Sequence, residues 1–161
     1  MDPDNNPGTI TDMPDVINNS WYDPTVTGEC TSIYESTLIS VEAAGIAVCF
    51  SAGNEGPGVS TITPPKNINT SLVNTFTIGN VNGNNVSYPI ESSSSRGPSI
   101  CGGTGSLLIK PEVVAPGANV RSCIGTNSYA LYTGTSMASP HAAGAILLLK
   151  EAFPEIGRAH V

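Results

Sequence analysis

The chain is poor in charged residues, and most of those it has are acidic. Charged side chains make up 12% of its 161 residues, and 6 lysines and arginines stand against 13 acidic residues, which gives a net charge of −7. This balance argues against nucleic acid and against an anionic membrane as partners, because both would repel the chain. No apolar run approaches the ~20 residues of a membrane span, and the longest, residues 142–149, is predicted to be a core helix.

A secretion signal is also missing from the start of the sequence, where residues 1–7 are polar and acidic. The length of 161 residues suits one ordinary domain. If the sequence is a piece of a longer protein, Met1 is an internal methionine, and the missing signal then carries no information about the parent protein.

The opening stretch is rich in Asp, Asn and Pro, but it lacks the pattern of a metal-binding loop. Asp2, Asp4 and Asp12 have neither the spacing nor the glycine of an EF-hand loop. A structural calcium ion is compatible with this composition but cannot be assigned to residues, and we predict no metal ligands.

The spacing of the four cysteines excludes a Cys-x-x-Cys zinc site or redox pair. Three full pairings of Cys30, Cys49, Cys101 and Cys123 can be drawn, and the sequence does not choose among them. Cys49 lies within an apolar run and is predicted to be a buried free thiol. Cys101 and Cys123 flank one excursion of the chain, and a bridge between them is as compatible with the sequence as two unpaired thiols.

The hydrophobic pattern predicts strands and a helix in the order of a βαβ unit. Residues 15–21 begin with a β-branched run and are predicted to be a buried strand, and residues 31–44 form an amphipathic helix that Gly45 ends. Residues 46–52 are a continuous apolar strand, which is typical of a parallel sheet covered on both faces. A further strand is predicted at residues 75–79. We therefore expect an α/β fold, with a mostly parallel sheet and helices on both faces.

An asparagine follows the strand at residues 46–52 directly. The string Ser-Ala-Gly-Asn-Glu-Gly-Pro covers residues 51–57. Ligands bind beyond the carboxyl ends of parallel strands, so Asn54 is placed where chemistry occurs in such folds. Taken alone, a Gly-Asn pair is more typical of a turn.

A serine stands at the start of the last predicted helix. The string Tyr-Thr-Gly-Thr-Ser-Met-Ala-Ser-Pro-His covers residues 132–141, and an apolar run follows it. A helix N-terminus offers free backbone N–H groups and the positive end of the helix dipole, which would stabilise a negative charge that develops near Ser136. In isolation, Thr135 or Ser136 would be read as an ordinary N-cap.

The full string over residues 134–141 resembles the nucleophile signature of the subtilisin-like serine peptidases, the subtilase family. Residues 51–57, 92–98 and 110–117 are similar to other recurrent segments of that family and follow in the family's order. The resemblance covers roughly residues 15–154. It implies an incomplete, subtilisin-like, Rossmann-like three-layer fold, because complete subtilase catalytic domains are considerably longer. Residues 1–154 are therefore interpreted as the C-terminal portion of a catalytic domain.

The last seven positions, residues 155–161, leave the helical pattern without a subtilase continuation. Back-translated, they resemble a common short-read sequencing adapter. We interpret them as read-through at the end of an assembled fragment, and a natural, poorly ordered C-terminus is the alternative.

The resemblance implies a secreted serine endopeptidase that hydrolyses peptide bonds through an acyl-enzyme on Ser136, with no cofactor needed for the chemistry. The oxyanion donors would be the Ser136 N–H and the Asn54 amide, with a weaker contribution from the Thr135 hydroxyl. The residues expected to contact a protein or peptide substrate are Ser20, Trp21, Ala52 and Gly53, which flank it as extended edges, and Tyr132, on the leaving-group side.

Two positions bear on the family's primary specificity pocket. The family usually has glycine where Tyr22 stands, which changes the shape of the pocket. Glu55 at its rim is expected to accept a basic side chain.

No catalytic base is evident. The histidines are His141 and His160, and His141 lies about 500° of helical rotation beyond Ser136, so it faces elsewhere. In subtilases the catalytic aspartate and histidine precede the oxyanion asparagine, and neither an Asp-Thr/Ser-Gly nor a His-Gly-Thr-His string occurs here. We therefore expect both residues to lie outside this chain, which alone would be inactive.

Two alternatives remain. A peptide-binding pseudoenzyme would keep the substrate-binding edges without a functional triad. An acyl hydrolase would need Gly-x-Ser-x-Gly, and Ala138 occupies its final glycine position. The oligomeric state is left open.

Overall fold

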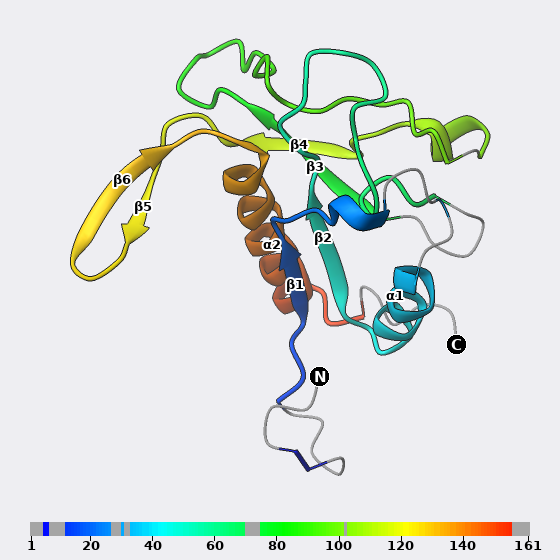
Figure 1. The fold of residues 1–161 in the computed structure, drawn as a ribbon. Coiled ribbons are helices and arrows are strands. Elements are labelled where there is room, and N and C mark those ends of the chain that lie inside the picture. The colour runs from blue at the N-terminus through cyan, green and yellow to red at the C-terminus, as the bar shows by residue number, and fades with distance from the viewer. Residues whose placement is uncertain are drawn as a thin grey trace.

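The computed structural model describes residues 5–6, 12–26, 30, 33–69, 75–101 and 103–155. Within them lie a four-stranded sheet of order β1-β2-β3-β4 and a separate two-stranded hairpin (Figure 1). All three pairings in the larger sheet are parallel. The α/β fold class expected from the hydrophobic pattern is confirmed.

Along the chain, β1, α1 and β2 follow in the order of the predicted βαβ unit. The sheet strands are β1 (Val16–Asn19), β2 (Ala47–Ser51), β3 (Phe76–Val81) and β4 (Val113–Pro116), and the hairpin is β5 (Val120–Ile124) and β6 (Ser128–Tyr132). The helices are α1 (Ile33–Ala43), α2 (Thr135–Ala152) and the short 3-10 turns η1 (Pro24–Val26) and η2 (Gly105–Leu108). Some predictions fall outside the described residues: those for Asp2, Asp4, the first two residues of the predicted helix at 31–44 and most of the C-terminal tail (156–161).

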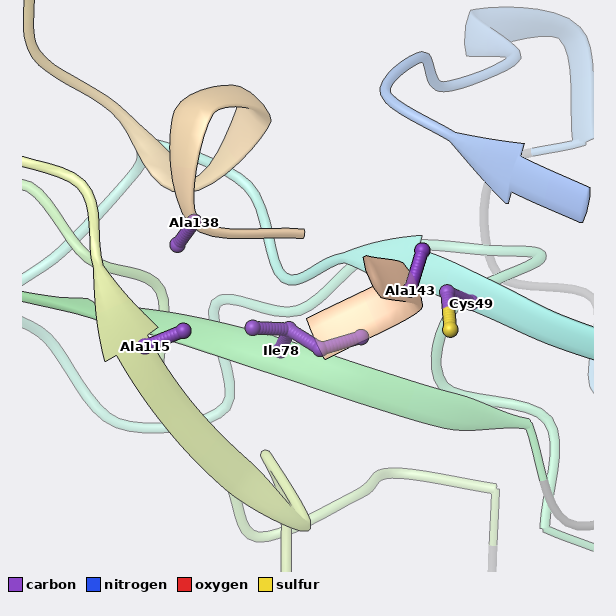
Figure 2. Close-up of a cluster of buried hydrophobic side chains, with 5 residues drawn as sticks. All are labelled: Cys49, Ile78, Ala115, Ala138 and Ala143. Atoms are coloured by element: carbon purple, nitrogen blue, oxygen red, sulfur yellow. The ribbon is translucent and has the colours of Figure 1, made fainter. Parts of the chain in front are cut away.

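Side chains that alternate along β2 build two hydrophobic cores, one on each face of the sheet. Cys49 packs with Ile78, Ala115, Ala138 and Ala143 beneath α2, as Figure 2 shows. The next residue of β2, Phe50, packs on the other face with Leu38 of α1 and with Ile68. Helices on both faces of a parallel sheet explain why β2 is apolar from Ala47 to Phe50.

Two expectations about burial are wrong in part. β1 is half-buried, and Asn18 within it is exposed, because β1 lies at one edge of the sheet. In the predicted core helix at 142–149, Ala143 is buried but Leu148 is 74% exposed, and Leu147 and Leu149 are exposed beside it. Successive helical residues are about 100° apart, so three consecutive leucines cannot all face one sheet. None of the described helices is long and apolar enough to cross a membrane.

The cysteine pairing differs from the bridge considered between Cys101 and Cys123. Cys101 pairs with Cys30 in a disulfide, and Cys123 is a free, exposed thiol in β5. Sequence separation does not reveal which loops meet in space, so the partner of Cys101 depends on tertiary structure. Cys49 is buried and free, as predicted, and burial raises the pKa of its thiol to about 11.

Thiol reactivity tests this pairing. We expect iodoacetamide at about pH 8 without reductant to alkylate Cys123 and to spare Cys49 until the protein is denatured, since only the thiolate reacts. Peptide mapping should recover Cys30 and Cys101 as one cross-linked pair, and a C123S control should take up no label in the native state. Recovery of a peptide that joins Cys101 to Cys123 would contradict the structure.

Candidate active site

The carboxyl end of β2 and the start of α2 are joined through one buried hydroxyl. The Gly53 N–H donates to Thr135 Oγ1 at 3.0 Å, and Thr135 Oγ1 donates to Asn54 Oδ1 at 3.2 Å. Asn54 Oδ1 also accepts from the Thr135 N–H at 3.0 Å. Because both bonds to the Asn54 amide reach its oxygen, the Asn54 Nδ2 group keeps its N–H donors for another partner.

The first turn of α2 presents the Ser136 side chain together with a free backbone donor. Thr135 N–H is bonded to Asn54, and the N–H groups of Met137 and Ala138 reach the Gly134 carbonyl at 3.0 and 3.3 Å. Neither the Ser136 N–H nor its Oγ has a hydrogen-bond partner among the described residues. A serine hydroxyl, its own N–H and the Asn54 amide therefore lie in adjoining positions at a helix N-terminus.

A proline inside α2 accounts for the position of Ser20. Pro140 has no N–H to donate to the carbonyl of the residue one turn earlier, Ser136. Ser20 Oγ donates to that carbonyl at 3.2 Å, and Asn18 Nδ2 donates to Ser20 Oγ at 3.2 Å. Asn18 Oδ1 in turn accepts from Ser139 Oγ at 2.6 Å. The exit of β1 is thereby attached to the same turn of α2 as Ser136.

Two close glycines bring β4 against this turn. The Gly134 N–H donates to the Gly117 carbonyl at 2.9 Å, and the Gly117 N–H donates to the Val81 carbonyl at 3.0 Å. A Cβ on Gly117 would lie 2.7 Å from the Gly134 carbonyl oxygen, which no side chain tolerates. Only glycine at position 117 therefore permits this approach.

The residues predicted to flank a substrate differ in how firmly their side chains and backbone groups are held by the protein. Trp21 is fixed by ring contacts with Tyr34 and Phe50 and donates Nε1–H to Asn19 Oδ1 at 3.0 Å. Ala52 is fully buried, and its N–H donates to the Ile78 carbonyl. Gly53 donates its N–H to Thr135, and its carbonyl accepts from the Ser95 N–H, so it can pair with a peptide only through the second lone pair of that carbonyl.

Tyr132 and His141 take no part in the hydrogen bonds given above between the described residues of this cluster. Tyr132 is exposed at the end of β6, where it pairs with Val120. His141 is exposed, and its Nδ1 is 2.8 Å from the carbonyl of Met137 in its own helix. It therefore does not face Ser136. His160 and the aspartates considered for calcium at positions 2 and 4 fall outside the described residues.

Sequence reasoning missed one polar group near Gly53. Lys66 is 2% exposed although its surroundings, Pro-Pro-Lys-Asn, read as a loop. Burial lowers the pKa of Lys66, and the nearby Glu55 carboxylate offsets part of that shift. A charged residue in a proline-rich loop gives no local signal that it is buried, so only the structure could reveal it.

Comparisons with known proteins identify the family of the chain. A family model described as the subtilase family matches residues 8–161. Subtilisin E of Bacillus subtilis (strain 168) is 34% identical over 155 residues, which is 94% of this chain and 35% of that protein. A subtilisin of Bacillus pumilus is also 34% identical over 155 residues, with 94% of this chain and 48% of that protein covered.

Two solved structures extend the comparison to the fold. One described as S41 psychrophilic protease superposes with a TM-score of 0.68 at 32% identity, covering 86% of this chain and 43% of its own. Sphericase superposes with a TM-score of 0.70 at 25% identity and the same coverage, 86% and 43%. The chain thus spans less than half of the length of these relatives.

The Thr135 hydroxyl provides a test of the site's construction. In T135V both hydroxyl bonds are lost, and we expect the free energy of unfolding to fall by about 1–3 kcal/mol because a buried Gly53 N–H is left unpaired. T135S keeps the hydroxyl and should lose clearly less, as measured by urea unfolding followed by circular dichroism. Equal losses in the two variants would show that the hydroxyl does not hold the segments together.

Proposed function

The chain belongs to the subtilase family, and on that premise we propose that it carries the nucleophile and the oxyanion donors of a serine endopeptidase. Its substrates are proteins or peptides, and Ser136 is acylated during their hydrolysis. The observation that carries this proposal is the fixed Asn54 amide. Its oxygen is held by Thr135, the residue before Ser136, while its nitrogen and the Ser136 N–H have no hydrogen-bond partner among the described residues.

Each group has a role that follows from its chemistry. Ser136 Oγ attacks the scissile carbonyl, and the negative charge that develops on the carbonyl oxygen is stabilised by the Asn54 Nδ2 and Ser136 N–H donors. The one proton of the Thr135 hydroxyl points to Asn54 Oδ1. Thr135 therefore acts as a positioning residue for Asn54 and Gly53.

A base must take the proton of Ser136, and we propose that it belongs to a part of the protein outside this chain. Three observations support this. The chain spans 35% of subtilisin E. His141 is bonded within its own helix. Leu147, Leu148 and Leu149 are exposed on α2, as expected of a surface that a further part of the domain would cover. This chain alone would be inactive. We further propose, from its membership of the family alone, that the parent protein is a secreted enzyme.

The alternative is a peptide-binding pseudoenzyme that uses the same edges without chemistry. It shares every contact described above and differs in one property, the reactivity of Ser136. A reagent that requires an activated serine therefore separates the two functions.

Labelling by a fluorophosphonate probe tests the endopeptidase directly. In the protein encoded by the complete open reading frame, we expect the probe to attach to Ser136 and an S136A variant to stay unlabelled, because only a serine with a base in reach becomes nucleophilic. Mass spectrometry of the labelled peptide identifies the site. Binding of peptides without any labelling of Ser136 would establish the pseudoenzyme instead.

The oxyanion role of Asn54 has its own test. Subtilisin, itself a member of this family, loses about 10²–10³-fold in turnover without the corresponding donor, and we expect N54A to fall within that measured range here. The matched control is N85A, since Asn85 is exposed and bonds only within its own turn. Turnover and KM are measured on one peptide substrate. A loss confined to KM would contradict a role in stabilising the transition state.

A further inference from the structure

Three polar side chains converge on one side of Gly53, next to the oxyanion asparagine. A Cβ built on Gly53 would lie 3.0 Å from Lys66 Nζ and 2.9 Å from Ser95 Oγ, and it would overlap Glu55 Oε2. Gly53 itself has a φ of +107°, a conformation that favours glycine. The polar cluster of Glu55, Lys66 and Ser95 therefore lies directly beneath one of the two segments expected to flank the substrate.

The second flanking segment reaches the same lysine. Tyr22 follows Ser20 and Trp21 in sequence, and Lys66 Nζ lies 5.5 Å from the centre of the Tyr22 ring. Tyr22 also stands where the subtilase pattern has glycine. Lys66 is thus contacted from both sides of the expected substrate path, by Tyr22 on one side and by the Gly53 segment on the other.

The Lys66 ammonium lacks the partners that a buried charge needs. It forms no ion pair or hydrogen bond with any described residue, although an ammonium has three N–H donors. The nitrogen itself is not fully enclosed, so the tip of the side chain keeps some contact with solvent. A buried charge without partners is costly, and a ligand carboxylate that reached this nitrogen would relieve that cost.

Lys110, the other lysine buried among the described residues, has a structural role and serves as a comparison. Lys110 is 6% exposed, and its ammonium donates to the Thr75 carbonyl and to Glu112 Oε1. With a longer contact to Thr77 Oγ1 at 3.4 Å, those bonds use all three of its donors within the protein. The backbone of Lys66 is bonded to Thr63, Thr75 and Thr77, but its ammonium has no such bonds to the described residues, so the fold does not account for a charge at this position.

Glu55 is the nearest carboxylate, but it is held by another group. Ser95 Oγ donates to Glu55 Oε2 at 2.8 Å and accepts from the Glu55 N–H at 3.1 Å. Glu55 is exposed to water, whereas Lys66 is buried. Charges interact more strongly where water is excluded, so the lysine outweighs the glutamate for a side chain that enters between Tyr22 and Gly53.

We propose that Lys66 determines substrate specificity, and that this protein prefers peptides with an acidic residue on the amino side of the scissile bond. The inference rests on the proposed endopeptidase function and adds the substrate class to it. It reverses the expectation from sequence that Glu55 would favour a basic side chain, because that expectation did not include the lysine beneath it.

Matched peptides test this preference. In the protein encoded by the complete open reading frame, kcat/KM is measured for peptides that differ only in having Glu, Gln or Lys before the cleaved bond. We expect Glu to exceed its neutral isostere Gln by at least about tenfold, the lower end of the coupling between close charge pairs. The Lys peptide should be the poorest substrate.

Two variants assign the preference to the polar cluster. K66M keeps the unbranched stem without the charge, and we expect its Glu-to-Gln ratio to fall to about one. E55Q removes the competing carboxylate and should raise that ratio several-fold. The control is K150M, because Lys150 pairs with Asp15 near the other end of α2, and its ratio should equal that of the wild type.

The outcomes separate this inference from the function on which it rests. A wild-type ratio of one or less, with rapid cleavage of the Gln peptide, would overturn the role of Lys66 and leave the endopeptidase intact. Failure to cleave any peptide, together with no labelling of Ser136, would overturn both. If K66M does not fold, E55Q decides alone, and a ratio unchanged in E55Q would count against the proposal.

Discussion

The arrangement of this site depends on one buried hydroxyl, that of Thr135. It accepts from the Gly53 N–H and donates to Asn54 Oδ1, so it links the loop after β2 to the first turn of α2. Leaving such a group without partners costs about 1–3 kcal/mol, which couples the two segments. The same bonds orient the Asn54 amide with its nitrogen free. The contacts that join the two segments are therefore the same contacts that orient the Asn54 amide, the proposed oxyanion donor.

Small residues make those contacts geometrically accessible. Ala138, Ser139 and Ala143 are the buried residues beyond the first position of α2, and they let the helix axis approach the sheet closely. Gly117 does the same for the backbone at Gly134. Ile146 packs against the core beneath α2, whereas Leu147, Leu148 and Leu149 are exposed on the C-terminal half of the helix.

The two buried lysines show how one residue type takes two roles according to its partners. Lys110 is bonded to Thr75 and Glu112 and stabilises the contact between the start of β3 and the start of β4. Lys66 is equally enclosed, but among the described residues its ammonium contacts only the Tyr22 ring and interacts with the charge of Glu55. The donors of Lys110 are used within the fold, whereas those of Lys66 remain available to a ligand.

The sequence by itself determined the first βαβ unit and the strand that follows it, the α/β class, the serine at the start of α2 and the asparagine after β2, but it did not reveal the hairpin of β5 and β6. Each of these depends on a local pattern, either the period of the apolar residues or a short sequence motif that indicates one kind of chemistry. Only the tertiary structure decided that Cys30 pairs with Cys101, that Leu147 to Leu149 stay exposed and that Lys66 lies buried beneath Gly53. These depend on which distant segments meet, and a loop such as the one around Lys66 has no periodicity from which its neighbours could be read.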